Sequence, residues 1–550
     1  MKKFTAILLA VVMVFALGAS AFAADTTPVT TKAVDTTLSV TVDYTIEGLY
    51  FDGTTLKSSA TNGYYPFNFS FIVSDRTAVG SITVSNGGSF AWASDSEDSE
   101  TESTTTTYGL VTLPTTSAST VTVTSKSGGT LTISCAQPNG GTSAAGTALY
   151  AYLPAPAQFV NEGVTTGGWG DAYDSNGAVK ANSTTGVSLG FFGGYAVYEF
   201  ENPIADDPTH PYGADFIVYG NAFWNNSEAG CIQVSENGTD WYDIAGSMYY
   251  TKSTKGATIT YTNPNPSEDK GITAAASNKG TLADVPYALT VNGTTTSGTV
   301  TKNTFHNHSW FPLNANYFVD SGTRKEMAKV DEFSFVSRTL NSDNITSTLT
   351  FKGTLLTDYP GTGKTDQIGF GYCDVHPNRT LGSTIAYNPY QTFTSSSDYN
   401  TKTEGTGGGD PIDIAWAVDS KGAPANLSSV KYVRIYTGMA QMNGIFGEIS
   451  TEVCGVAACT GSTTETAATP TITVGTSTVT TTNGGIKSVG MLSGTCTVNV
   501  SGTGYVYING VATTSATFTP TSAGTKVQII VQNGEAAPYV TWLNLKTGRA

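Results

Sequence analysis

Two segments of this chain, residues 214–246 and 410–451, constrain its fold more than any other feature of the sequence. In the first segment, Phe216–Tyr219 is a run of β-branched and aromatic residues. A second such run, Cys231–Val234, is followed by the pair Asn237-Gly238. Such a run before an Asn-Gly pair predicts a β-hairpin. In the second segment, residues 430–436 predict a further strand, with alternate side chains on opposite faces. We expect both segments to belong to one domain that closes over the long insertion between them.

The remainder of the chain also has the pattern of β-structure. Apolar side chains alternate with polar ones near both ends, at Leu38, Val40, Val42, Tyr44 and Ile46 and again at Val527, Ile529 and Val531. Ten Asn-Gly pairs supply the positive φ that hairpin turns need. No long stretch has the 3.6-residue apolar period of a helix. The sequence therefore predicts an all-β fold made of sandwiches.

The composition narrows the class of protein. Only 13% of the residues are charged, Gly occurs 60 times, and the formal net charge is −16. A strongly acidic chain disfavours nucleic acid and anionic lipid as partners and suits cation binding. Solubility of a secreted protein is an equally simple reason for the charge. This composition is typical of extracellular β-rich proteins.

The first residues have the pattern of a secretory signal. Lys2 and Lys3 precede an apolar run, and Ala21-Phe22-Ala23 has the small-x-small form of a cleavage site. We therefore expect residues 1–23 to be removed and the protein to be secreted or displayed on the cell surface. No later run is long and apolar enough to predict a transmembrane segment.

Composition divides the remaining chain into modules. Residues 24–146 predict an N-terminal Ig-like β domain, residues 147–456 an aromatic-rich central domain, residues 457–468 a linker, and residues 469–550 a C-terminal Ig-like β domain. Six widely spaced cysteines contain no CxxC pair, and the sequence does not choose among their disulfide connectivities. Cys454 and Cys459 are close enough in sequence for a disulfide to close a small loop.

Several phrases of the central domain together carry a resemblance to a known class. They are GGYAVYEFENPI, ADFIVYGNAFW, IQVSENGTDWYDIAGS, GYCDVHPN, IDIAWAVD, VKYVRIYTG and FGEISTEV. In this order they resemble secreted bacterial cell-surface proteins whose central region is similar to galactose-binding-like, discoidin-type jelly rolls. The resemblance covers residues 147–456 and neither flanking module. It implies a two-sheet sandwich with a bound calcium near one edge and ligand loops at one end, and it implies no particular reaction.

Candidate calcium ligands lie at predicted strand ends within these phrases. Calcium takes six to eight oxygen ligands, mostly from carboxylates and carbonyl groups. Asp215, Asn221, Asp413 and Glu448 have such oxygens, and Glu448 lies in a turn beside glycine residues. These four residues are the predicted metal ligands. The simpler interpretation is that their side chains cap turns and bind no ion.

Candidate ligand-binding residues lie mainly in the insertion. His306 and His308 share a face if they lie on a strand, and Asp374 and His376 are further candidates for binding the same metal or ligand. Hydrogen bonding to loops is the simpler role for these histidines. Aromatic faces stack on sugar rings, so the loop aromatics predict a glycan site. They are Trp224, Trp310 and Tyr390.

These features favour a binding or adhesion protein that recognises a glycan or another surface ligand through a calcium-stabilised jelly roll. A secreted polysaccharide-active enzyme and a purely structural surface component are the alternatives. No GxSxG, HExxH or Cys/His signature of a known enzyme class is present. If catalysis occurs, Asp374, Asp413 and Glu448 are the candidate catalytic residues.

Overall fold

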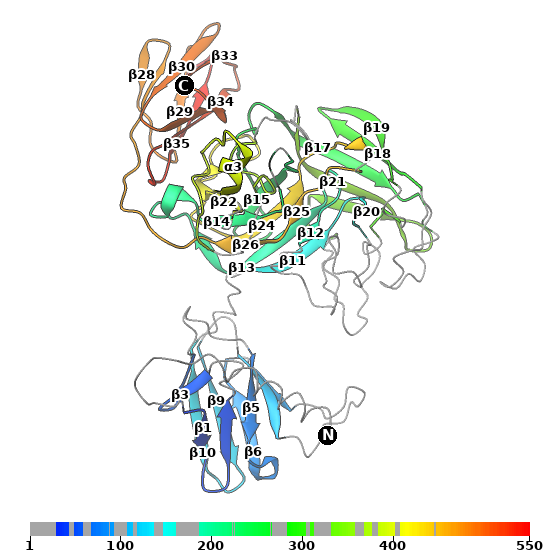
Figure 1. The fold of residues 1–550 in the computed structure, drawn as a ribbon, viewed down its shortest axis with the longest axis vertical. Helices are drawn as coiled ribbons and strands as arrows, with labels where there is room; N and C mark the ends of the chain where they lie inside the picture. Colours follow the sequence, from blue (N-terminus) through cyan, green and yellow to red (C-terminus); the bar gives the residue numbers. More distant parts are fainter. Residues whose placement is uncertain are drawn as a thin grey trace. The chain divides into compact units, whose positions relative to one another are not determined.

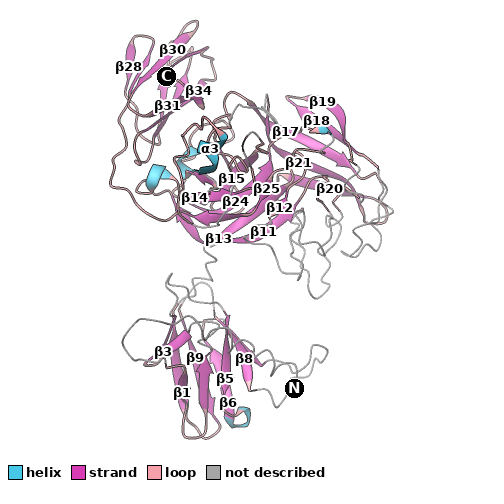
Figure 2. Cartoon of the chain, in the orientation of Figure 1, coloured by secondary structure: helices cyan, strands magenta, loops and turns pink. Residues whose placement is uncertain are grey.

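The structure, a computed structural model, forms two compact units, Met1–Gly141 and Thr142–Ala550. Among the described residues, strands make up 49% and helices 4%, which confirms the predicted all-β sandwich class (Figure 2). The structure describes residues 29–42, 49–58, 68–86, 88–92, 107–113, 118–136, 147–160, 186–222, 224, 226–264, 266, 283–303, 309–312, 330, 332–357, 368–376, 383–401, 408–444 and 447–549.

The N-terminal unit is a sandwich of two five-stranded sheets. The first sheet contains, in spatial order, β1 (Thr31–Ala33), β2 (Ser39–Val42), β5 (Asn68–Val73), β8 (Tyr108–Thr112) and β7 (Ser89–Trp92). The second contains β3 (Leu49–Asp52), β4 (Thr55–Ser58), β10 (Thr130–Cys135), β9 (Ser119–Ser125) and β6 (Val79–Val84). Leu38, Val40 and Val42 are buried in its core as their alternation predicts, whereas Tyr44 and Ile46 lie outside the described residues.

A six-stranded sheet is the middle layer of the central region. Its strands, in spatial order, are β11 (Thr147–Leu153), β13 (Tyr195–Ala205), β24 (Ser429–Thr437), β15 (Gly230–Ser235), β16 (Tyr242–Ile244) and β23 (Ala417–Val418). Strand β15 pairs with β24, and β16 pairs with β23. The two segments that opened the sequence analysis therefore share one sheet, which confirms that they belong to one domain.

A three-stranded sheet covers one face of this middle layer. It contains β22 (Asp410–Ile412), β14 (Phe216–Tyr219) and β26 (Gly455–Ala458). Val433 and Ile435 of β24 face it and lie in one core cluster with Phe216 and Val218 of β14. Residues 457 and 458, where the sequence predicts the start of a linker, are paired in β26 with Ile217 and Phe216.

A five-stranded sheet from the insertion covers the opposite face of the middle layer (Figure 1). It contains β19 (Thr294–Val300), β18 (Val285–Val291), β17 (Ser253–Thr262), β21 (Thr346–Leu356) and β20 (Val336–Leu340). Tyr436 of β24 and Tyr195 of β13 pack against Ile259 and Phe351 in this second core. The central region therefore has three layers, one more than the two-sheet sandwich that the resemblance implies.

The C-terminal module is a sandwich of two sheets. One contains β28 (Ser477–Val479), β27 (Thr471–Val474), β30 (Cys496–Ser501) and β33 (Ser515–Phe518). The other contains β29 (Ile486–Val489), β35 (Tyr539–Leu545), β34 (Thr525–Gln532), β31 (Tyr505–Ile508) and β32 (Val511–Ala512). Ile529 and Val531 face the module's own core, as their alternation predicts.

The opposite face of this second sheet packs directly on the central region. Ile530, Val540 and Trp542 belong to the core cluster between the six-stranded and three-stranded sheets. The indole Nε1 of Trp542 donates a hydrogen bond of 2.8 Å to the Tyr250 hydroxyl. This module is therefore docked on the central region, although the sequence predicts a linker between the two at residues 457–468.

The remaining described elements are short. Strand β12 (Val187–Ser188) pairs with β25 (Glu452–Val453), and the helices are η1 (Arg76–Ala78), η3 (Pro211–Gly213), α3 (Ser396–Tyr399) and η6 (Ile414–Trp416). Within the described part of the chain, none of the helices combines the length and hydropathy needed to cross a bilayer.

The structure contains no disulfide among the six cysteines, all of which lie in its described part. Cys454 and Cys459 lie on either side of β26, and an extended strand of this length separates them by about 16 Å. A disulfide requires Cα atoms within about 7 Å of each other. The disulfide between these two residues that their sequence spacing predicts is therefore wrong for this fold.

Candidate functional site

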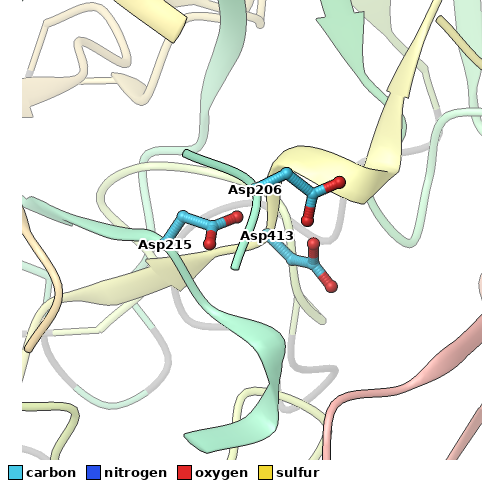
Figure 3. A group of neighbouring side chains, drawn as sticks. All are labelled: Asp206, Asp215 and Asp413. Carbon is cyan, nitrogen blue, oxygen red and sulfur yellow. The ribbon is translucent and has the colours of Figure 1, made fainter. Parts of the chain in front are cut away.

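Three aspartates meet at one end of the three-stranded sheet. Asp215 directly precedes β14 and Asp413 directly follows β22, and the antiparallel register pairs their neighbours Phe216 and Ile412. Asp206 follows the end of β13. Carboxylate oxygens of the three aspartates lie within 4.8 Å of one another (Figure 3). We call Asp206, Asp215 and Asp413 the aspartate triad.

Backbone amides orient the two buried members of the aspartate triad. Asp215 Oδ1 accepts a hydrogen bond from the backbone N–H of Asp207, and its Oδ2 accepts one from the N–H of Ile414, both at 2.9 Å. Asp413 caps η6, because its Oδ1 accepts a hydrogen bond of 2.8 Å from the N–H of Ala415. Each carboxylate therefore has a fixed direction and still has lone pairs that a cation can use.

The electrostatics of the aspartate triad disfavour three full negative charges. Burial, followed by the charges of Asp215 and Asp207, raises the pKa of Asp206 from 3.8 to about 6. Burial also raises the pKa of Asp215, and burial with the charges of Asp215 and Asp206 raises that of Asp413 well above its usual range. His210 is the one basic side chain that the described residues place beside the triad, with Nδ1 3.4 Å from Asp215 Oδ1. Protons or a cation must neutralise the remaining charge.

A second acidic group lies at the opposite end of β14. Asp374, Glu228 and Glu452 have carboxylate oxygens within 4.8 Å of one another, and we call them the mixed triad. Asp374 Oδ1 accepts hydrogen bonds from the backbone N–H groups of Asn221 (2.7 Å) and Ala222 (2.9 Å), which follow β14. A Cβ at Gly220 would lie 2.4 Å from this oxygen, so glycine there permits the close approach.

The mixed triad holds protons more strongly than ordinary carboxyl groups do. Burial of the carboxyl groups, followed by the charge of Asp374, raises the pKa of Glu228 to about 8. Burial raises the pKa of Asp374 to about 7. Burial and the charges of Glu228 and Asp374 raise the pKa of Glu452 well above its usual range, and the Glu228 and Glu452 carboxyl groups are hydrogen bonded to each other. Part of this group is therefore protonated near neutral pH when no cation is bound.

The four predicted calcium ligands divide between these two groups. Asp215 and Asp413 belong to the aspartate triad. Asn221 contacts Asp374 through its backbone N–H, and the charge of Glu448 acts on Glu228, so both lie beside the mixed triad. Glu448 is 3% exposed and its Oε1 accepts a hydrogen bond of 3.2 Å from the backbone of Gln158. The four predicted residues therefore lie in or beside two separate acidic groups and do not converge on one site.

Two of the predicted ligand-binding residues lie in a single aromatic cluster. The His376 ring is stacked 5.4 Å from Tyr399, and Trp224 packs edge-on against the same Tyr399 ring at 5.4 Å. His376 Nδ1 is 2.8 Å from Asp410 Oδ1, so the histidine is a hydrogen-bonded residue of the loop core. Of the two roles that the sequence leaves open for the histidines, this is the simpler one.

The other predicted ligand-binding residues do not join that cluster. Trp310 and Tyr390 are each 1% exposed and lie in the two central cores, so neither ring can stack on a sugar. Both residues lie in loops, as the sequence predicts, but these loops pack against the central cores and bury the two rings. Asp374 belongs to the mixed triad. His306 and His308 lie outside the described residues.

Sequence reasoning missed three members of the acidic groups, namely Asp206, Glu228 and Glu452. Asp206 stands in an Asp-Asp pair directly after a long strand, and this position was a usable signal. Glu452 lies within a two-residue strand and Glu228 in an irregular segment before β15, where no spacing rule marks them. No protein-family model matches the chain, and no curated protein matches its sequence, so these assignments rest on geometry.

Proposed function

We propose that this protein is an exported binding or adhesion protein of the cell surface, and that calcium stabilises its central sandwich. We further propose that its ligand is a glycan or another surface molecule. The supporting observation is the aspartate triad, whose residues adjoin the ends of β13, β14 and β22 and come from distant parts of the chain. An ion held there would tie together the ends of three strands from distant parts of the chain.

The chemistry of the donor set favours calcium over a transition metal. The aspartate triad offers carboxylate oxygens, and calcium prefers six to eight such hard ligands, with water completing the shell. Zinc in proteins takes cysteine and histidine ligands more often. His210 contacts Asp215 through Nδ1 at 3.4 Å and is the one imidazole that the described residues place there.

The resemblance to galactose-binding-like jelly rolls supports the same proposal, because it implies calcium near one edge of the sandwich. Polysaccharide hydrolysis has less support. The candidate catalytic residues Asp374, Asp413 and Glu448 are 0%, 2% and 3% exposed and lie in two separate acidic groups. A substrate cannot reach such carboxyl groups without rearrangement.

Two measurements test the proposed function. The first is isothermal titration of the chelator-treated protein with Ca²⁺ and, separately, with Zn²⁺; we expect saturable binding of Ca²⁺ and weaker binding of Zn²⁺. The second is a glycan array probed with and without calcium, and we expect signals that chelation removes. Release of reducing sugar from a polysaccharide would instead identify an enzyme. A calorimetric titration that shows no heat of Ca²⁺ binding, together with a melting temperature that Ca²⁺ does not change, would contradict the calcium site.

A further inference from the structure

Three partly exposed aromatic side chains gather on one face of the six-stranded sheet. They are Tyr150 on β11, Tyr432 on β24 and Trp241 in the turn that leads into β16. All three pack against the core between the six-stranded sheet and the sheet of the insertion. We call them the aromatic platform. None of them belongs to the acidic groups or to the cluster around His376.

Buried phenylalanine rings hold the platform together from below. The Tyr150 and Tyr432 ring centroids are 5.4 Å apart. The ring centroid of Phe333 lies 6.4 Å from that of Tyr150 and 6.0 Å from that of Trp241, so one buried ring packs against both of these platform residues. Phe333 is stacked on Phe335 at 4.8 Å, and both are at most 6% exposed. The exposed rings therefore rest on a rigid apolar base.

The turn that carries Trp241 is also held in place. The indole Nε1 of Trp241 donates a hydrogen bond of 3.1 Å to the Gly238 carbonyl. Asn237 Oδ1 accepts hydrogen bonds of 2.9 Å from the backbone N–H groups of Thr239 and Asp240. A Cβ at Gly238 would lie 3.4 Å from the Tyr432 ring, so this turn directly abuts the platform. A rigid platform loses little conformational entropy when it binds a ligand.

Polar groups line the platform where sugar hydroxyls would need partners. The Tyr150 hydroxyl donates to Glu332 Oε1 at 2.5 Å, and the Tyr432 hydroxyl donates to Glu199 Oε1 at 3.1 Å. Lys431 Nζ lies 2.9 Å from the same Glu199 oxygen. Flat rings beside carboxylates and an ammonium group are the combination that binds a pyranose, because the rings cover its C–H face and the charged groups bind its hydroxyls.

The charge around the platform selects among polysaccharides. Glu199 and Glu332 adjoin the rings, and Glu236 and Asp240 are exposed on the neighbouring turn. The basic residues that the described contacts place there are Lys431 and the buried Arg434, which is stacked on Phe335. This local excess of negative charge repels uronic acids and sulfated sugars. It is compatible with neutral sugars.

We propose that Tyr150, Tyr432 and Trp241 form a stacking surface for the pyranose rings of a neutral polysaccharide. This inference rests on the proposed function and assigns its glycan contact to a surface other than the predicted Trp310 and Tyr390, which are buried. The platform spans β11 and β24 together with the β15–β16 turn, so a chain of linked sugars can contact more than one ring.

Pull-down on insoluble cellulose and chitin tests the platform in the full-length protein, with soluble alginate as the acidic comparison. We expect wild type to bind at least one neutral polymer and alginate more weakly. We expect Trp241→Ala and Tyr432→Ala each to weaken that binding about tenfold, because stacking is lost. Tyr432→Phe keeps the ring and should retain most of the binding. Tyr505→Ala removes an exposed ring from the C-terminal module and should change nothing.

Each outcome has a distinct meaning. Trp241 also packs on Phe333, so thermal melting of every variant must match wild type, and Tyr432→Ala serves as the second variant if Trp241→Ala fails to fold. Binding of wild type that both alanine variants retain would overturn the platform and leave the proposed function standing. Tighter binding to alginate than to the neutral polymers would overturn the choice of ligand. Binding to none of the polymers would overturn the platform and remove glycan recognition from the proposed function.

Discussion

Substitution of Asp413 by asparagine should separate calcium binding from folding. Asparagine keeps an Oδ1 that can accept the 2.8 Å hydrogen bond from the Ala415 N–H, so the cap of η6 survives. The substitution removes one of three carboxylates that lie within 4.8 Å of one another. We therefore expect a folded protein that no longer responds to calcium.

The size of the effect follows from the geometry of the triad. Two ionised carboxylates about 4.8 Å apart repel each other by roughly 3 kcal/mol at an effective dielectric constant of 20. Without calcium, this repulsion and burial favour the protonated form of Asp413, so Asp413→Asn should change the melting temperature little. In wild type, calcium at a hundred times its Kd adds about 2.7 kcal/mol of stability, which corresponds to a rise of roughly 5 °C.

The pH dependence gives a second, independent signature. The pKa of Asp206 is about 6 in the folded state and 3.8 ordinarily, so the calcium-free folded state binds more protons than the unfolded state between these values. The stability that this group contributes is therefore present at low pH and is lost as pH rises through about 6. Calcium competes with those protons, so its stabilising effect should be larger at pH 8 than at pH 5.5.

Differential scanning calorimetry of paired samples, one loaded with calcium and one treated with a chelator, measures these shifts in melting temperature. Asp52→Asn is the matched control, because Asp52 is an exposed aspartate of the N-terminal unit that pairs with Lys57 at 2.6 Å. It should leave the calcium response unchanged. An equal calcium shift in wild type and Asp413→Asn, or a shift that grows as pH falls, would refute the reasoning.

Three further predictions concern the fold. Trp542→Ala should lower the free energy of unfolding by about 3–5 kcal/mol in urea titrations, because it empties the docking core and removes the hydrogen bond to Tyr250. Arg434 is fully buried and stacked on aromatic rings, so Arg434→Met should change stability by less than about 1.5 kcal/mol or increase it, whereas Arg434→Ala should cost about 3 kcal/mol. Peptide mapping without reductant should find no disulfide between Cys454 and Cys459.

The sequence predicted strand pairing well where both partners carry strong local patterns. The Asn237-Gly238 pair predicted a hairpin, and β15 pairs with β16 on either side of it. Residues 430–436 predicted a strand, and β24 contains them. Val433 and Ile435 face one core and Tyr436 faces the other, as a period of two requires. These features depend on residues close in sequence or on strict alternation, so they can be read without coordinates.

The layer count was missed although a signal for it exists. Tyr195, Ala196, Val197 and Tyr198 are all fully buried, and such a continuous apolar run is typical of a strand covered on both faces. Ile530 likewise indicates that β34 is covered on both faces. It is an apolar residue between Ile529 and Val531, and it lies in the central core, whereas these two lie in the module's own core. A run without polar residues predicts a second covering layer, but not which segment supplies it.

The acidic groups were only partly predictable because they form by register and not by spacing. Asp215 and Asp413 meet because Phe216 pairs with Ile412, and no pattern within either segment specifies that register. Asp410 lies three residues before Asp413 and faces the other end of β14, where it contacts His376. Acidic residues that are close in sequence, such as Asp410 and Asp413, can thus lie in different parts of the fold. A list of acidic residues alone therefore cannot show which of them form a common group.

The two acidic groups should respond to calcium differently. In the mixed triad, three backbone N–H groups already bond to Asp374, and Glu228 and Glu452 share a hydrogen bond that requires a proton. The raised pKa of Glu228, about 8, keeps that proton in place near neutral pH, so a cation must displace it. In the aspartate triad, burial also raises the pKa values of Asp215 and Asp413, but Asp206 is partly exposed and its pKa of about 6 leaves it largely ionised at pH 7. Calcium should therefore bind first at the aspartate triad, and binding at the mixed triad should release protons and strengthen as pH rises.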